Sequence, residues 1–149
     1  MAISFGAGYA QPILDHVFDR ITRPELDQSH DRIVELESML HREGGVLIKL
    51  WLHLSRDAQK KRIKQLEADP SQRWRIFKRD WRLFTHYDAY RSVGEHVLRR
   101  TGTGDAPWTI VEGTDRRYCH LTVARVLLDA LRGRLDRAGG GFAVAAERP

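Results

Sequence analysis

A short apolar run that passes directly into a basic helical segment limits the fold of this chain most strongly. The run covers residues 46–53, and the basic segment that follows covers residues 55–82. Lys49 and His53 lie within the run, which is too short and too polar to cross a bilayer. It is typical of a buried strand, so the chain must contain a strand that leads into positive charge.

Strand and helix signals alternate along the rest of the chain. Residues 2–5 are predicted to be a strand, and a helix is predicted to start near Pro12. Thr22 and Glu25 form a capping-box pattern at the start of a second helix, which Gly44 and Gly45 end. Ser55 is predicted to cap a third helix that ends at residues 69–70. One long helix over 78–100, a strand over 108–111 and a last helix over 115–135 complete the pattern.

This alternation predicts an α/β fold with a parallel sheet of about three strands flanked by helices. A sheet with so few strands leaves an open edge, so we expect an incomplete sheet that can pair with another chain. We expect one domain over residues 1–137, with the basic segment as a lid. The glycine-rich stretch 138–149 is predicted to be a flexible tail.

The positive charge is concentrated in the middle of the sequence. Residues 56–100 carry thirteen basic and six acidic side chains, whereas residues 1–55 carry five basic and eight acidic ones. Such clustering is typical of proteins that bind a polyanion, which can be a phosphate chain, a nucleotide or nucleic acid. A solvated helical face gives the same pattern, so charge alone leaves both interpretations open.

Several separated motifs resemble the polyphosphate kinase type 2 family, and most closely the first half of two-domain polyphosphate:AMP phosphotransferases. They are KLWLHLS at residues 49–55, QKKR at 59–62, DP at 69–70, RWR at 73–75 and APW at 106–108. The resemblance covers residues 1–136. It implies a fold like that of phosphate-loop kinases and a transfer of phosphate from polyphosphate to AMP or another nucleotide.

Two phosphate-handling parts of that family have no counterpart in these residues. The 149 residues contain no GxxxxGK phosphate loop. The family motif DRSWYNR, aligned on its tyrosine, falls on residues 5–11, so Phe5 stands where the metal-binding acid would be. The family implies Mg²⁺ as cofactor, but a phenylalanine cannot bind it, and no ligand for it is identifiable. We therefore expect the chain alone to be a defective catalyst, with no catalytic residue assigned.

The resemblance assigns the polyphosphate contacts to Lys61, Arg62, Arg73 and Arg75. Because Arg73 and Arg75 flank Trp74, alternate positions would aim both guanidinium groups one way and pack the indole on the other. Solvated cations, or ion pairs within the helix such as Arg62 with Glu67, are the competing interpretation. Lys60 and Lys64 are predicted to share a helix face.

The loop after the third predicted strand is a candidate nucleotide site. Asp115 and Arg116 lie there, at the edge where α/β sheets bind ligands. The alternative is that Asp115 caps the last helix, with Thr114 as its competitor.

Two other functions remain open from the sequence. One is a non-catalytic partner or regulatory domain that supports an intact kinase half. Its expected partners are an intact kinase domain or further copies of this chain in a homo-oligomer. The other is a nucleic-acid-binding module, because lysines interleaved with Trp and Tyr also suit single strands. A single cysteine, Cys119, and the lack of a secretory signal pattern predict a cytoplasmic protein with no membrane partner.

Overall fold

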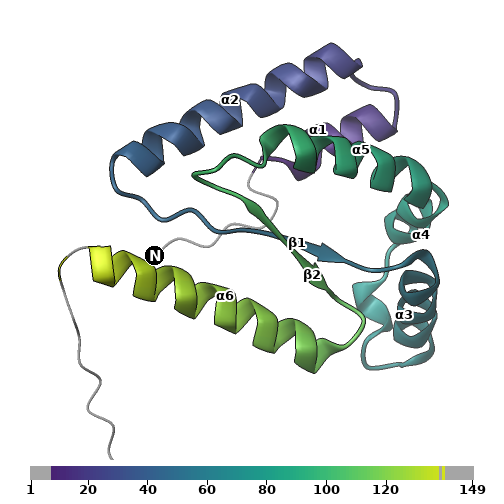
Figure 1. Ribbon diagram of the computed structural model, residues 1–149. Helices are drawn as coiled ribbons and strands as arrows, with labels where there is room; N and C mark the ends of the chain where they lie inside the picture. The colour runs from purple at the N-terminus through teal and green to yellow at the C-terminus, as the bar shows by residue number, and fades with distance from the viewer. Residues whose placement is uncertain (1–7, 138, 140–149) are drawn as a thin grey trace, which may run out of the picture.

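The computed structural model describes residues 8–137 and 139 (Figure 1). In chain order the elements are α1 (Ala10–Val17), α2 (Arg23–Arg42), β1 (Lys49–His53), α3 (Arg56–Ala68), the 3₁₀ helix η1 (Arg73–Arg75), α4 (Lys78–Thr85), α5 (Tyr87–Thr101), β2 (Trp108–Glu112) and α6 (Arg116–Arg137). The predicted strand at 2–5 lies outside the described residues, as does the predicted tail apart from Gly139. None of the described helices is long and apolar enough to cross a membrane.

The sheet within the described residues consists of β1 and β2, which pair in parallel. The register places Lys49 opposite Trp108 and His53 opposite Glu112. β1 begins three residues later than the predicted apolar run. Its partner strand cannot extend the pairing before Trp108, because the preceding residue, Pro107, has no N–H to donate to β1. α1, α2 and α5 lie on one side of the sheet and α6 lies on the other (Figure 1). The predicted α/β fold with a parallel sheet is confirmed.

Local capping signals predicted several helix ends correctly. The backbone N–H and the hydroxyl of Thr22 both donate to the Glu25 carboxylate, at 2.7 and 2.8 Å. The Ser55 hydroxyl accepts from the N–H of Ala58 at 3.2 Å. Gly44, just beyond α2, has φ +79°, a conformation that favours glycine.

The predicted single helix over 78–100 is wrong, because the structure has two helices, α4 and α5, that meet at His86. The Thr85 hydroxyl donates to the carbonyl of Arg82 at 2.7 Å, and His86 Nδ1 lies 2.9 Å from the same oxygen. The His86 ring also packs edge-on against Phe18, which lies beyond α1. The break depends on these tertiary and side-chain contacts, so helical periodicity could not show it.

The core lies between α1, α2, α5 and the sheet. Ile13, Leu26 and Val97 are fully buried, and Tyr9 and Val93 pack with them. His30 is fully buried among them, and its Nδ1 has no hydrogen-bond partner within the described residues. Burial lowers the pKa of His30, so the ring is neutral at neutral pH.

Lys49, the first residue of β1, places a charge inside this core. Its side chain is 7% exposed, and its ammonium donates to Glu37 Oε2 at 2.8 Å and to the carbonyl of Thr101 at 2.7 Å. The Tyr9 hydroxyl lies 3.5 Å away and itself donates to Glu37 at 2.9 Å. The ammonium also lies 5.1 Å from the centre of the Trp108 ring. One cation thus joins three helices and both strands.

Removing one partner of this ion pair should destabilise the fold strongly. Lys49→Met or Glu37→Leu leaves a buried charge unpaired, which costs about 3–5 kcal/mol. The double variant should cost clearly less than the sum of the two, because it removes both charges. Urea unfolding of the four proteins measures this coupling.

The exposed pair Arg56–Asp88, with side chains 53% and 63% exposed, provides the control. Its removal by Arg56→Met should have a far smaller effect. If the two substitutions at Lys49 and Glu37 lowered the free energy of unfolding additively, the result would contradict a buried ion pair between them.

Gly94 is required where α5 crosses β1. A Cβ at this position would lie 2.8 Å from the ring of Trp51. Gly94→Ala should therefore lower the free energy of unfolding by about 1–3 kcal/mol, although alanine normally favours a helix. Gly133→Ala is the matched control, because a Cβ there meets nothing within 4 Å. It should stabilise α6 by roughly 0.5–1 kcal/mol, and equal effects at the two sites would contradict the Trp51 contact.

Candidate functional site

The carboxyl edge of the sheet is where the basic segment and the loop after β2 meet. β1 leads through Leu54 into α3, and β2 leads through Gly113 into α6. The N–H of Gly113 donates to the carbonyl of His53 at 2.8 Å, so the two exits are adjacent. Figure 1 shows α3 and α4 grouped at this end of the molecule. Ligands of parallel α/β sheets bind at this edge.

The basic segment, residues 55–82, folds as one packed unit. α3 contacts both η1 and α4, and Ile63 is its buried residue. The indole N–H of Trp81 donates to Glu67, which joins α4 to α3. At its base, the unit is held by the Tyr87 hydroxyl, which donates to the carbonyl of Leu54 at 2.8 Å, and by the Arg56–Asp88 pair at 2.9 Å.

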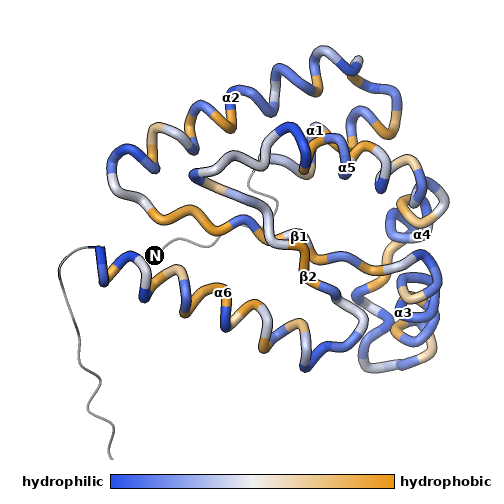
Figure 2. The backbone as a smooth tube through the Cα atoms, in the orientation of Figure 1, coloured by the Kyte–Doolittle hydropathy of each residue, from blue (hydrophilic) through white to orange (hydrophobic). Residues whose placement is uncertain are grey.

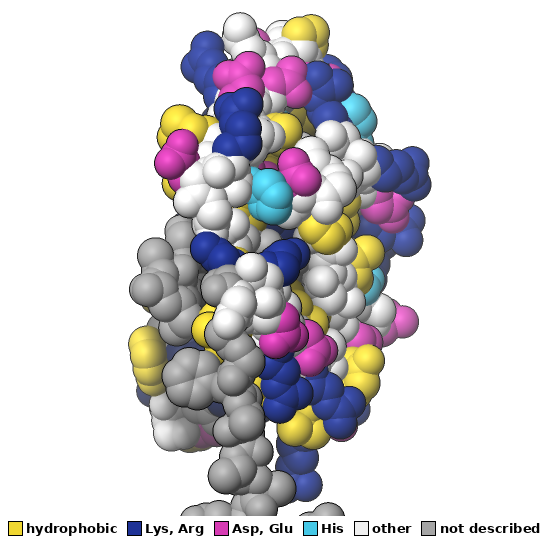
Figure 3. Space-filling view, turned by 60° about the vertical axis from the view of Figure 1, so that its left-hand side comes forward, with side chains coloured by type: hydrophobic (Ala, Val, Ile, Leu, Met, Phe, Trp, Pro, Cys, Tyr) yellow, Lys and Arg dark blue, Asp and Glu magenta, His cyan; other side chains and the backbone are white. Residues whose placement is uncertain are grey.

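Apart from Arg56, most cations of this unit are exposed and lack acidic partners among the described residues. None of the following has an ion pair there: Lys60, Lys61, Arg62, Lys64, Arg73, Arg75, Lys78 and Arg79. The predicted competitor, an Arg62–Glu67 pair, is wrong, because Glu67 accepts from Trp81 instead. Figure 3 shows a face of the molecule on which basic and acidic side chains lie beside each other. Elsewhere in the described residues cations do have ion pairs, such as Arg100 with Asp31 at 2.8 Å.

Lys61, the lysine predicted to contact polyphosphate, shares a helix face with two other lysines. Lys60, Lys61 and Lys64 line a shallow hollow along α3, together with Asp57, Gln65 and Ala68. Arg62 is not among the residues that line it. The structure thus groups Lys61 with Lys60 and Lys64. The resemblance had not assigned Lys60 or Lys64 to the site, although the spacing of four residues between them indicated a common helix face.

The predicted arrangement of Arg73 and Arg75 is wrong in its geometry. These residues form a 3₁₀ helix, in which successive side chains point about 120° apart, so alternate positions do not face the same way. Trp74 is 71% exposed rather than packed, and its indole N–H donates to the carbonyl of Ser71 at 2.9 Å. Both arginines remain exposed, so each can reach a ligand from a different direction.

Asp115 caps α6, as the alternative interpretation of this residue predicted. Its carboxylate accepts from the N–H of Tyr118 at 2.9 Å, so Asp115 and not Thr114 caps α6. Glu112 accepts from the N–H of Thr114 at 2.7 Å, and its hydrogen bonds to Thr114 lower the pKa of this carboxyl. Arg116 is exposed beside them. The nucleotide role of Asp115 and Arg116 stays a prediction.

The described residues contain no recognisable group of Mg²⁺ ligands. No three carboxylate, histidine or cysteine side chains among them are grouped as metal ligands. The two carboxylates at the edge of the sheet, Glu112 and Asp115, already accept backbone N–H bonds. The family acid position, Phe5, lies outside the described residues. We therefore assign no step to the ion.

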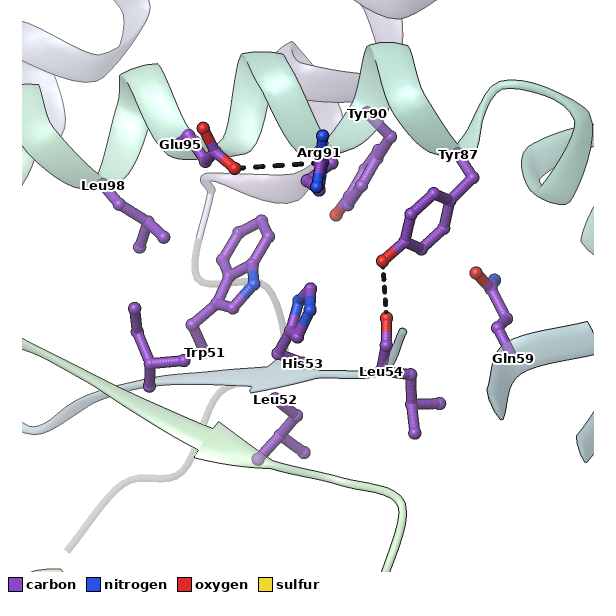
Figure 4. Close-up of a pocket in the computed structure, with 11 residues that line it drawn as sticks. Trp51, Leu52, His53, Leu54, Gln59, Tyr87, Tyr90, Arg91, Glu95 and Leu98 are labelled. Carbon is purple, nitrogen blue, oxygen red and sulfur yellow. Dashed lines mark hydrogen bonds and ion pairs between the residues drawn. The ribbon is translucent and has the colours of Figure 1, made fainter. Parts of the chain in front are cut away.

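A second hollow, of about 370 Å³, lies between β1, α5 and the start of α3. Figure 4 shows Trp51 pointing towards α5 and the Tyr87 hydroxyl directed at the Leu54 carbonyl. Trp51 stacks on Tyr90 with ring centres 6.0 Å apart, and burial raises the pKa of Tyr90. The sequence predicted Trp51 as a core residue but did not reveal this hollow.

Comparison with known proteins gives a consistent match over nearly the whole chain. The family model described as "Polyphosphate kinase 2 (PPK2)" matches residues 6–138. A polyphosphate:AMP phosphotransferase of Pseudomonas aeruginosa is 44% identical over 133 residues, which cover 89% of this chain and 27% of that protein. An AMP/ADP-polyphosphate phosphotransferase of Meiothermus ruber is 27% identical and is covered to 47% of its length.

Solved structures agree with these matches. The crystal structure of polyphosphate kinase 2 from Arthrobacter aurescens superposes with a TM-score of 0.80 at 30% identity, covering 84% of this chain and 44% of that one. A putative polyphosphate kinase 2 from Pseudomonas aeruginosa gives a TM-score of 0.72 at 39% identity, with 88% and 25% covered. This chain therefore spans less than half the length of these relatives.

Proposed function

The chain belongs to the polyphosphate kinase 2 family, and from this we propose that its basic segment, residues 55–82, binds polyphosphate. The lysines that line α3 would contact the phosphate chain from one side, and Arg73 and Arg75 would contact it from the neighbouring 3₁₀ helix. Relatives named as phosphotransferases acting on polyphosphate with AMP or ADP support this choice of polyanion.

The observation that carries the proposal is a group of exposed cations without ion pairs at the carboxyl edge of a parallel sheet. Lys61, Lys64, Arg73 and Arg75 have no acidic partner within the described residues, so binding a polyanion breaks no ion pair there. Guanidinium groups bind phosphate oxygens by charge-assisted hydrogen bonds. The start of the unit is also held to α5, by the Tyr87 hydrogen bond to Leu54 and by the Arg56–Asp88 pair.

We further propose that the chain's share in phosphoryl transfer is to hold the donor. By family, the reaction moves a terminal phosphoryl group from polyphosphate to AMP or another nucleotide. The residues of this chain supply positive charge for that step but no phosphate loop, and Phe5 replaces the family acid. Arg116 is the remaining candidate for a nucleotide contact, because the Asp115 carboxylate caps α6.

The prediction is that removal of two cations from the segment weakens polyphosphate binding by about tenfold or more, which corresponds to roughly 1.4 kcal/mol. The variants are Lys61→Ala with Lys64→Ala, and Arg73→Ala with Arg75→Ala. Binding should also weaken as salt is raised, because exposed charges are screened. Isothermal titration calorimetry with polyphosphate at low and high salt measures both effects.

A variant with the same loss of charge elsewhere provides the control. Arg32 and Arg42 are exposed on α2, so Arg32→Ala with Arg42→Ala should leave binding nearly unchanged. Equal losses in all variants would show that net charge alone attracts the polyanion. Single-stranded nucleic acid is titrated in parallel, and tighter binding of it than of polyphosphate would favour the nucleic-acid-binding alternative.

A further inference from the structure

α6 carries a second apolar stripe that the rest of the described chain does not cover. Leu121, Leu128, Leu131 and Leu135 are 59%, 45%, 50% and 46% exposed, and Ala124 is exposed between them. Figure 2 shows apolar positions recurring along the whole of α6. A monomer gains nothing from exposing so many leucines on one helix, so a run of this kind indicates a contact surface.

This stripe lies beside the half-buried face of α6 and continues around the helix away from the sheet. Val123, Val126, Leu127 and Ala130 are half-buried, and α6 makes its contacts with β2. At about 100° per residue, the centre of the exposed leucines lies roughly 130° from the centre of this half-buried face. The apolar surface of α6 therefore extends well beyond the part that packs on the sheet, which is typical of a helix with a further packing partner.

The spacing within the exposed stripe specifies the kind of partner. Residues 121, 124, 128, 131 and 135 follow one another at intervals of three and four, the a and d pattern of a coiled-coil seam. The side chains of such a seam insert between the side chains of another helix, and the two helices cross at a shallow angle. A second α-helix therefore fits this surface better than an extended strand or an irregular loop.

The charges beside the seam decide between a second copy and a different helix. Arg125 and Arg132 follow the two d positions, and Arg117 occupies the d position one heptad earlier. All three are exposed, and none has an ion pair within the described range of residues. In an antiparallel pair of α6 helices Arg125 and Arg132 would face each other, and in a parallel pair the two Arg117 side chains would meet, so like charges disfavour pairing of two copies. A helix with carboxylates at the flanking positions would pair with them.

We propose that the outer stripe of α6, residues 121–135, binds an amphipathic helix of another polypeptide whose apolar seam is flanked by Asp and Glu. The inference goes beyond polyphosphate binding, because the stripe uses no residue of the basic segment. It also specifies a surface through which the partner-domain alternative could act.

Two designed peptides test this surface directly. Both carry leucine at heptad positions a and d, one with glutamate and the other with lysine at e and g, so neither pairs well with itself. In calorimetric titrations with the full chain, the acidic peptide should bind at least tenfold more tightly than the basic one. Arg125→Glu with Arg132→Glu should reverse this preference.

Leu128→Ser with Leu131→Ser should abolish binding of the acidic peptide, and circular dichroism should show an intact fold because both side chains are exposed. Leu36→Ser with Met39→Ser removes similarly exposed apolar groups from α2 and should leave binding unchanged. Failure to bind the acidic peptide, or equal affinity for both peptides, would overturn the proposal. A dimer of the unmodified chain in sedimentation experiments that the Leu128 and Leu131 changes dissolve would also overturn it, in favour of a second copy.

Discussion

The buried ammonium of Lys49 is the constraint on which the arrangement of the helices and strands depends. A cation that is 7% exposed is stable only if anionic and carbonyl oxygens surround it, and Glu37 and Thr101 supply them. Glu37 lies in α2, and Thr101 is the last residue of α5, where the helix dipole also favours a cation. Burial and the neighbouring Glu37 raise the pKa of Tyr9, which keeps its hydroxyl a neutral donor. These groups can meet only if α1, α2, α5 and β1 adopt their observed packing.

The same arrangement separates the rigid end of the sheet from the end that carries the positive charge. Lys49 and Trp108 begin the two strands, and the strands lead away from the buried ion pair to the edge where the basic segment starts. The contacts there include the exposed pair Arg56–Asp88 and the part-buried hydrogen bond from Tyr87 to Leu54. The fold thus offers a fixed base and an exposed cationic unit, which suits the capture of a long flexible anion better than the binding of a small enclosed ligand.

Structural features that depend only on neighbouring residues, such as helix caps, could be predicted from the sequence. Features that depend on contacts between residues far apart in the sequence could not. The caps at Thr22, Ser55 and Asp115 follow from side chains that bond to backbone within three residues. The break at His86 needs Phe18, and the burial of Lys49 needs Glu37, so neither shows in a local pattern. For the candidate site, the sequence located the basic segment and the face shared by Lys60 and Lys64. It did not show the 3₁₀ helix at Arg73–Arg75, which points the two arginine side chains in different directions. The roles of these lysines and arginines as polyphosphate ligands stay predictions.

The central claim is that polyphosphate binds to the basic segment and not to the arginines of α6, which are also exposed. A heteronuclear NMR titration of the 17.2 kDa chain with polyphosphate distinguishes the two surfaces, because it resolves amide and guanidinium N–H signals separately. The account predicts the largest changes at residues 60–64 and at the guanidinium groups of Arg73 and Arg75, with little change at Arg125 and Arg132. The largest changes on α6, or no saturable change in residues 55–82, would contradict it.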